Sequence, residues 1–175
     1  MCSITTPRLC IRPFAADDWR DLYEYLSQEE AVRFEPYDAF TEDEARREAL
    51  DRSRDGDYHA VCLLGEGKLI GSLYLSRRDC GTMEFGYVFN PKYWGSGYAT
   101  EAARALMTRA FEDGSARRIA AGCDPRNERS WKLLERLGFR REGRLIKNVW
   151  FKKDASGAPI WKDTYLYGLL KEEWD

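Results

Sequence analysis

The sequence predicts an α/β protein of the α+β kind, in which helices cover both faces of a twisted, mixed and mostly antiparallel sheet. Three observations support this prediction. A helical hydrophobic period changes to a strand-like one after residue 57, glycine-containing turns separate the strand-like runs, and helices alternate with strands from residue 98 onward. The 175 residues, 43% of them hydrophobic, suffice for one core, so we expect a single domain over residues 1–175.

The first third of the chain predicts one strand and two helices. Residues 8–13 alternate in polarity and end at a proline, which is typical of a short strand. Asp17 and Asp18 precede apolar residues at helical spacing, which indicates a helix from about residue 19. Thr41 followed by Glu44 is a capping-box pattern and predicts that a second, charged helix begins there.

The middle of the chain predicts a meander followed by a helix. Residues 58–64, 69–75 and 83–89 are strand-like runs, and glycines occupy both turns between them. Residues 98–111 have helical spacing with alanines on one side. Because these side chains are small, the helix can lie close to a sheet.

The last third predicts a strand, a helix and a closing hairpin. Residues 118–123 form an apolar strand, and residues 127–137 form a helix that Gly138 ends as its C-cap. Residues 139–151 and 160–170 then form the hairpin. The predicted order is therefore βααβββαβαββ, with about seven strands and four helices.

Composition excludes several classes of protein. The net charge of -2 gives no reason to expect a nucleic-acid partner. The five cysteines are scattered and His59 is the only histidine, so we expect neither a disulfide framework nor a metal site. No apolar stretch approaches the ~20 residues of a membrane span, and no signal segment opens the chain. We expect a cytoplasmic protein with no membrane partner.

Residues 90–99 form the most informative segment. A strand ends near Pro91, a turn with Gly95 and Gly97 follows, and a helix begins at Tyr98. Glycine lets the backbone approach a ligand, and the helix start directs unpaired N–H groups and its positive dipole end at the same place. The segment therefore predicts an anion site, most naturally for phosphate, with a plain tight turn as the alternative.

Two other phosphate-binding motifs fit this region less well. A P-loop requires a lysine after its second glycine, whereas Tyr87 follows Gly86. A dinucleotide fingerprint would need a third glycine where Thr100 stands, and too few strands follow for a doubly wound sheet. An NAD(P)-dependent reductase is therefore a less favoured alternative.

The segment resembles the acyl-CoA-binding motif of the GNAT superfamily of N-acetyltransferases: Gln or Arg, two variable residues, Gly, one variable residue, then Gly or Ala. Here the motif falls on residues 94–99, with Trp94 in place of Gln or Arg. Residues 127–139 resemble the family's later helix, which begins with Asn and ends in Gly-Phe. The resemblance covers residues 7–174, and both ends are similar to the branch of ribosomal-protein alanine and serine N-acetyltransferases.

The resemblance implies acetyl-CoA as co-substrate. In the family, loop amides hold the CoA diphosphate, and pantetheine bonds to the edge of the preceding strand. The backbone N–H near Phe89 would also polarise the thioester carbonyl. The implied contacts are Val88, Phe89, Asn90, Trp94, Gly95, Ser96, Gly97, Tyr98, Ala99, Thr100, Asn127 and Ser130.

Glu84 and Ser130 are the implied catalytic residues. Glu84 lies close to where several relatives place a glutamate base, with an exposed strand carboxylate as the alternative. Many relatives use a helix tyrosine as general acid, and Leu134 occupies that position here. Ser130 matches a serine that the ribosomal-protein branch uses near the sulfur; a solvated helix serine is the alternative.

The resemblance places the acceptor between the connection of the first two helices and the last hairpin. We expect Glu35, Tyr37, Trp161 and Asp163 to contact it. The predicted function is acetyl transfer from acetyl-CoA to a small-molecule amine or a protein N-terminus, by direct attack in a ternary complex. A CoA-binding module that has lost catalysis is the alternative, and family analogy also allows a homodimer.

Overall fold

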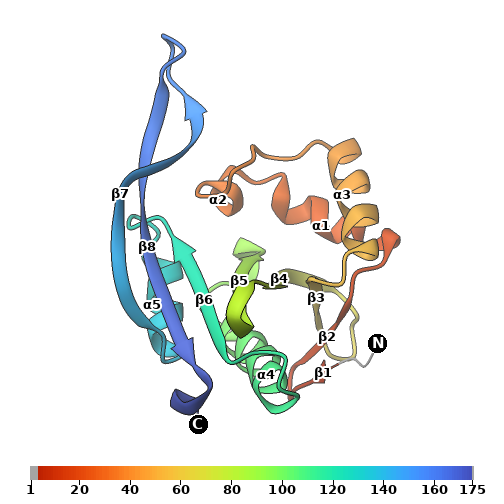
Figure 1. Ribbon diagram of the computed structural model, residues 1–175. Helices are drawn as coiled ribbons and strands as arrows, with labels where there is room; N and C mark the ends of the chain where they lie inside the picture. The colour runs from red at the N-terminus through yellow and green to blue at the C-terminus, as the bar shows by residue number, and fades with distance from the viewer. Residues whose placement is uncertain (1–3, 175) are drawn as a thin grey trace.

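A single eight-stranded sheet runs through the computed structural model, which describes residues 4–174 (Figure 1). The strand order is β1-β2-β3-β4-β5-β6-β8-β7, and every neighbouring pair is antiparallel except β5 with β6. The sheet is therefore mixed and mostly antiparallel, as predicted. The strands are β1 (Ile4–Thr5), β2 (Leu9–Pro13), β3 (Tyr58–Leu63), β4 (Leu69–Arg77), β5 (Thr82–Phe89), β6 (Arg118–Cys123), β7 (Arg140–Lys153) and β8 (Pro159–Leu170).

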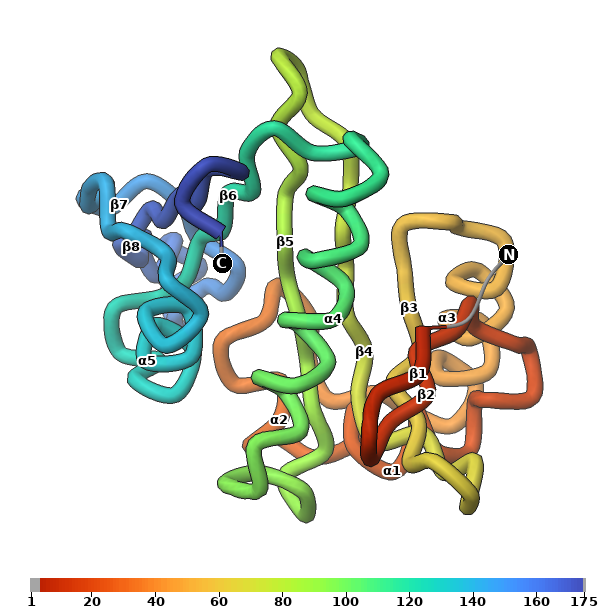
Figure 2. The backbone as a smooth tube through the Cα atoms, turned by 90° about the horizontal axis from the view of Figure 1, so that it is seen from below, coloured from red at the N-terminus to blue at the C-terminus, as the bar shows by residue number. Residues whose placement is uncertain are grey.

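Helices cover both faces of the sheet. α4 lies across β4 and β5 on one face (Figure 2), whereas α1, α2 and α3 gather on the other (Figure 1). α5 packs beside β6 and β8. The α-helices of residues 4–174 are α1 (Trp19–Leu26), α2 (Glu29–Val32), α3 (Glu42–Arg54), α4 (Tyr98–Glu112) and α5 (Glu128–Arg136).

The structure confirms the predicted fold class and adds two short elements to the expected seven strands and four helices. β1 has two residues and α2 has four. Elements of this length contain about one repeat of the hydrophobic period or less, so no periodic pattern can reveal them. α2 matters for the site, because it leads into one wall of it.

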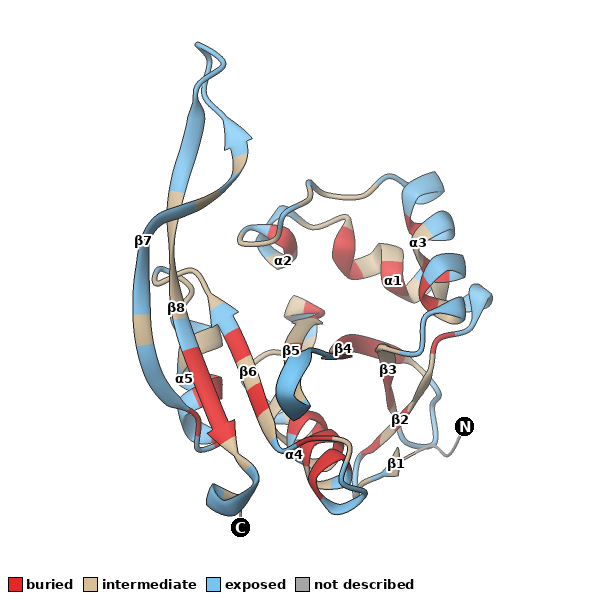
Figure 3. Cartoon of the chain, in the orientation of Figure 1, coloured by how far each residue is buried: buried red, intermediate tan, exposed pale blue. Residues whose placement is uncertain are grey.

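Two hydrophobic clusters hold the layers together, one on each face of β5. Phe85 and Phe89 belong to the larger cluster, with α4 and α5. Val88 packs against the smaller cluster, with α1 and α3. Successive side chains of a strand point to opposite faces, so β5 is covered on both. Figure 3 shows buried residues concentrated around this centre, while most of the long β7–β8 hairpin is exposed.

β5 and β6 separate soon after they begin to pair. Their parallel pairing covers three residue pairs and ends at Glu84. On its other side β5 stays paired with β4, and the N–H of Asn90 donates to the carbonyl of Ile70 at 2.9 Å. Alternate residues of an antiparallel ladder direct their main-chain groups to opposite sides. The N–H and C=O groups of Tyr87 and Phe89 therefore point toward the side of β5 on which β6 no longer pairs with it.

Candidate active site

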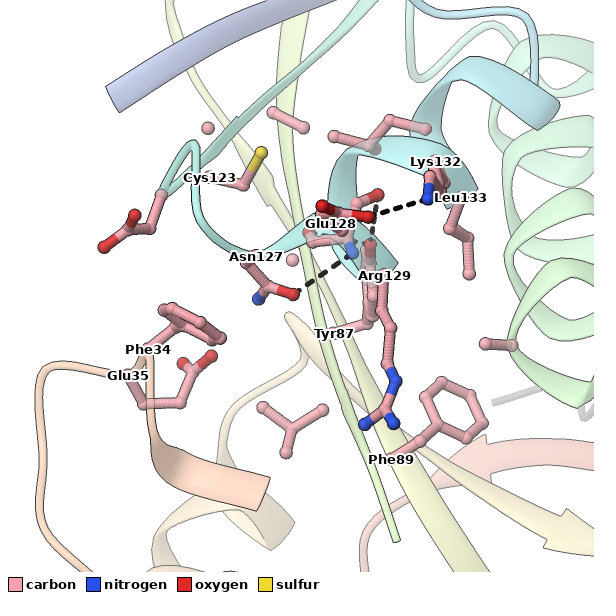
Figure 4. Close-up of a pocket in the computed structure, with 18 of the residues that line it drawn as sticks. Phe34, Glu35, Tyr87, Phe89, Cys123, Asn127, Glu128, Arg129, Lys132 and Leu133 are labelled. Atoms are coloured by element: carbon pink, nitrogen blue, oxygen red, sulfur yellow. Dashed lines mark hydrogen bonds and ion pairs between the residues drawn. The ribbon is translucent and has the colours of Figure 1, made fainter. Parts of the chain in front are cut away.

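A cavity of about 1370 Å³ lies between the separated ends of β5 and β6. Its walls come from α2 and the segment after it, the loop before α4, the start of α5, and the β7–β8 hairpin (Figure 4). Small-molecule sites usually enclose about 300–1,000 Å³. The cavity therefore has room for a coenzyme together with a second substrate.

The loop before α4 presents main-chain donors to this cavity. Gly95 and Gly97 have φ of 76° and 81°, a region in which only glycine is comfortable. Gly97 is the N-cap of α4 and supplies no side-chain cap. Within the described chain, the N–H groups of residues 95–100 have no protein acceptor. These donors and the positive end of a 15-residue helix form an anion site.

Arg8, at the start of β2, holds this loop in place. Its Nη1 donates to the carbonyl of Ser96 at 2.9 Å, and its Nε donates to Glu101 at 2.7 Å. Its guanidinium also lies 4.4 Å from the ring centroid of Tyr98. This role could not be predicted from the sequence, because Arg8 lies 88 positions from Ser96 and 93 positions from Glu101, and contacts over such separations leave no local pattern.

Trp94, which stands where the family motif has Gln or Arg, contacts both the end of β5 and α5. Its indole N–H donates to the carbonyl of Phe89 at 2.9 Å, and the Arg129 guanidinium lies 4.2 Å from its ring centroid. A Cβ on Gly71 would lie 2.5 Å from the Phe89 ring, so this glycine makes room for it. Phe89 is thereby fixed with its carbonyl engaged and its N–H facing the cavity.

Ser130 lies beside a partly buried tyrosine, Tyr87. The Tyr87 hydroxyl is 2.9 Å from Ser130 Oγ and donates to the Ser130 carbonyl at 3.0 Å. Burial raises the pKa of Tyr87 well above its usual value. Asn127 caps α5 by accepting from the Ser130 N–H at 3.2 Å. Leu134, which stands at the usual position of the acid, is 1% exposed in the core.

Two of the three predicted carboxylates that line the cavity, Glu84 and Glu35, have different surroundings. Glu84 is about half exposed and accepts hydrogen bonds from the Arg78 guanidinium, 2.8 Å from Nε. Glu35, in the segment after α2, has no hydrogen-bonding or ion-pair partner for its carboxylate within residues 4–174. Burial raises the pKa of Glu35 from 4.5 to about 7, partly opposed by Arg52 and Lys162.

The structure brings most of the predicted site residues together, but not all. Asn90 is fully buried and does not line the cavity; its side-chain amide donates to Glu24 of α1 at 3.1 Å. Ser96, Tyr37 and Trp161 also lie outside the lining of the cavity. The remaining residues line it: Glu35, Glu84, Val88, Phe89, Trp94, Gly95, Gly97, Tyr98, Ala99, Thr100, Asn127, Ser130 and Asp163.

Among residues 4–174, no three or more His, Cys, Asp or Glu side chains cluster so as to hold a metal ion. None of the helices described is long and apolar enough to cross a bilayer. Cys10, Cys62, Cys80 and Cys123 are free thiols, and Cys2 lies outside the described residues.

The open edge of β5, the amide-lined loop and the cavity together define a site suited to an extended, phosphate-bearing ligand. The family model described as "Acetyltransferase (GNAT) domain" matches residues 8–140, and the chain belongs to this family. The N-acetyltransferase YnaD of Bacillus subtilis is 38% identical over 176 residues, which cover 98% of this chain and 99% of YnaD. The crystal structure of a GNAT-family acetyltransferase from Bacillus anthracis has a TM-score of 0.87 at 35% identity, covering 98% of this chain and 100% of that one.

More distant relatives have names that include an acceptor. The spermidine N(1)-acetyltransferase of Escherichia coli K12 is 28% identical over 171 residues, covering 89% of this chain and 87% of that protein. The ribosomal-protein-S5-alanine acetyltransferase of Vibrio fischeri has a TM-score of 0.80 at 24% identity, covering 100% of both chains. That likeness shows the fold alone. The predicted membership of the GNAT superfamily is confirmed.

Proposed function

We propose that this chain transfers an acetyl group from acetyl-CoA to a primary amine by direct attack in a ternary complex. The observation that supports this most is the position of the anion-binding loop at the end of the open edge of β5. A diphosphate on the loop would place pantetheine beside Tyr87 and Phe89 and the thioester near Ser130. The chain would act as one domain, residues 1–175, alone or as a homodimer.

The coenzyme would be held mainly by main-chain groups. The amides of residues 95–100 suit its diphosphate, and Arg8 keeps them in position. Val88 and Phe89 would line the pantetheine channel, and Asn127 and Ser130 would close it from α5. Because few side chains contact the ligand, Trp94 can replace the usual Gln or Arg without loss of the site.

Acetyl transfer needs a donor for the developing oxyanion, an acceptor for the amine proton and a donor for the leaving thiolate. The Phe89 N–H faces the cavity and would donate to the carbonyl oxygen. Glu84 is the proton acceptor that the sequence suggests. The Ser130 hydroxyl would donate to the thiolate, and Tyr87 would hold the serine in place.

The acceptor is proposed to be a small-molecule amine or a protein N-terminus. The relative named for spermidine supports a small-molecule amine, and the resemblance of both ends of the chain to the ribosomal-protein branch supports a protein N-terminus. Glu35 and Asp163 line the cavity away from the loop, with Tyr37 and Trp161 farther out. The net charge of -2 does not favour a nucleic-acid partner.

A CoA-binding module without catalysis is a second candidate function. The observation that favours it is Leu134, which leaves α5 without the tyrosine that many relatives use as acid. A nicotinamide-dependent reductase is disfavoured by the sheet, because β5 and β6 form its only parallel pair within the described strands.

Purified protein tested with acetyl-CoA and a panel of amines separates these functions. The panel contains spermidine, peptides beginning with alanine or serine, and free amino acids, and release of the CoA thiol is followed. We expect turnover with at least one amine. Tight acetyl-CoA binding with no turnover on any of them would favour the binding module. Thermal stabilisation by NADH but not by CoA would favour a reductase.

A further inference from the structure

One carboxylate of the cavity differs from the others in having no cationic partner. Seven carboxylates line the cavity, and six of them form an ion pair: Glu30–Arg129, Glu84–Arg78, Glu101–Arg8, Asp124–Arg126, Glu128–Lys132 and Asp163–Arg144. The seventh is Glu35, for which residues 4–174 provide neither an ion pair nor a hydrogen-bond donor to its carboxylate. A carboxylate that is even partly buried is costly without a partner, which favours a partner from outside the protein.

Glu35 lies on the wall opposite α5. Figure 4 shows Phe34 and Glu35 on the α2 side of the cavity, across from Asn127 and Cys123, with Tyr87 between the two walls. The N–H of Glu35 donates to the carbonyl of Val32 at 2.9 Å, which fixes the turn after α2. The carboxylate therefore faces the same space as the Tyr87–Ser130 pair, from the opposite side.

The charged groups around Glu35 leave it basic near neutral pH. Arg52 of α3 is buried beneath it, but that guanidinium already donates to Glu48 at 2.7 Å and to Ser72 at 3.0 Å. Lys162 of β8 approaches from the hairpin, and its own pKa is lowered by burial. Both cations only partly oppose the effect of burial, and the pKa of Glu35 is about 7.

Two phenols complete these surroundings. Tyr37, on the same segment, and Tyr87, on β5, both have pKa values raised by burial, and the charge of Glu35 raises them further. Both phenols therefore stay neutral over the range in which Glu35 titrates. Glu35 is the group of this wall that exchanges a proton near pH 7.

We propose that Glu35 receives the acceptor as an ammonium ion and takes one proton from it, so that the neutral nitrogen can attack, an inference that rests on the proposed function. In this first step an N–H bond breaks and an O–H bond forms on the Glu35 carboxylate. A C–N bond then forms at the acetyl carbonyl, the C–S bond breaks, and the second proton lost by the nitrogen goes to the thiolate, which leaves near Ser130 as the CoA thiol. No oxidant or further reactant is needed.

Glu35 suits this role better than Glu84. To bind an ammonium ion, Glu84 would have to give up the Arg78 guanidinium, which donates to its carboxylate through two nitrogens. Glu35 needs to break no contact of its own. The acceptor is accordingly a cation, and its charge compensates a buried carboxylate that the fold leaves unpaired.

The first test measures kcat/KM against pH for wild type, Glu35→Gln, Glu35→Asp and Glu84→Gln, with acetyl-CoA and the best acceptor from the panel above. We expect the wild-type value to rise with pH and level off above about 7. Glu35→Gln should be about 10²-fold slower and lack this inflection. Glu35→Asp and Glu84→Gln should keep it at reduced rates, and acetyl-CoA affinity should be unchanged in Glu35→Gln.

A second measurement needs no acceptor. In protein carrying ¹³C-labelled glutamate carboxyls, one resonance should titrate near pH 7 and disappear in Glu35→Gln. The inference is overturned if no such resonance exists, or if Glu35→Gln keeps the wild-type inflection while Glu84→Gln loses it. A wild type that binds acetyl-CoA but acetylates no amine would overturn the proposed function as well, so the two failures are distinguishable.

Discussion

The Tyr87 hydroxyl lies 2.9 Å from Ser130 Oγ and joins the central strand to α5 across the base of the cavity. In the proposed mechanism this contact positions the hydroxyl that would donate to the leaving thiolate, in place of the helix tyrosine that Leu134 replaces. It also connects residues 43 positions apart in sequence.

Ser130→Ala should lower turnover about tenfold or more while acetyl-CoA affinity changes little, because the hydroxyl is needed when negative charge develops on sulfur. Tyr87→Phe should have a smaller effect of about fivefold, since it removes one hydrogen bond of about 1 kcal/mol that only positions the serine. Steady-state kinetics and calorimetric titration with acetyl-CoA measure both. Equal activity of Ser130→Ala and wild type would make the serine structural.

Gly97→Asp should abolish acetyl-CoA binding, because it places a carboxylate beside the amides that would hold the diphosphate. Gly114→Asp is a matched control: Gly114 has φ of 75° and open space around its Cα, but lies at the other end of α4. Both variants should lose about 1–2 kcal/mol of stability from the left-handed conformation. Only Gly97→Asp should lose binding; equal affinities would refute the loop assignment.

Arg8→Ala should weaken acetyl-CoA binding about tenfold, since the loop carbonyl of Ser96 loses its donor. The free energy of unfolding should change by less than about 1 kcal/mol, because the ion pair with Glu101 is partly exposed. Arg46→Ala removes a comparable exposed pair with Glu42 on α3 and serves as the control. If both variants bind acetyl-CoA equally well, Arg8 does not position the loop.

Glu35→Gln should stabilise the fold at alkaline pH. The pKa of Glu35 is raised from 4.5 to about 7, so ionisation costs stability progressively as pH rises between these values. The variant should therefore match wild type near pH 4 and exceed it above pH 8 by at most about 3.5 kcal/mol, because about 2.5 pKa units correspond to roughly 1.4 kcal/mol each and solvent screens part of this effect. Urea unfolding at both pH values measures this, with Glu66→Gln in the turn between β3 and β4 as a control for charge. A gain that is the same at both pH values would contradict the burial of a charged carboxylate.

Local patterns predicted most of the fold, because most of its elements are longer than one period of their pattern. α3 begins where Thr41 and Glu44 predict, and both hydrogen bonds of its capping box are present. The glycine turns of the meander and the hairpin turn at residues 154–157 also lie where expected. β1 and α2 were missed, since two and four residues show no period.

The candidate site was predictable only where it is local. The loop around Gly95 and Gly97 is a continuous segment, so glycine spacing and a helix start suffice to indicate it. Arg8 and Tyr87 act through partners many residues away, and no single sequence shows such pairs. The difference between Glu84 and Glu35 depends on which cation folds back onto each, and that is a property of tertiary structure.

The three-pair junction between β5 and β6 makes the sheet incomplete at its centre. Beyond it, the outward main-chain groups of Tyr87 and the N–H of Phe89 meet no neighbouring strand in the described chain. An extended ligand with amide groups would hydrogen-bond to these main-chain groups in place of a neighbouring strand. It would thereby link the parts of the sheet on either side of this junction. Loading this protein should therefore stiffen it as a whole, so that occupancy is detectable as slower amide exchange in the part of β8 after Thr164, which does not line the cavity.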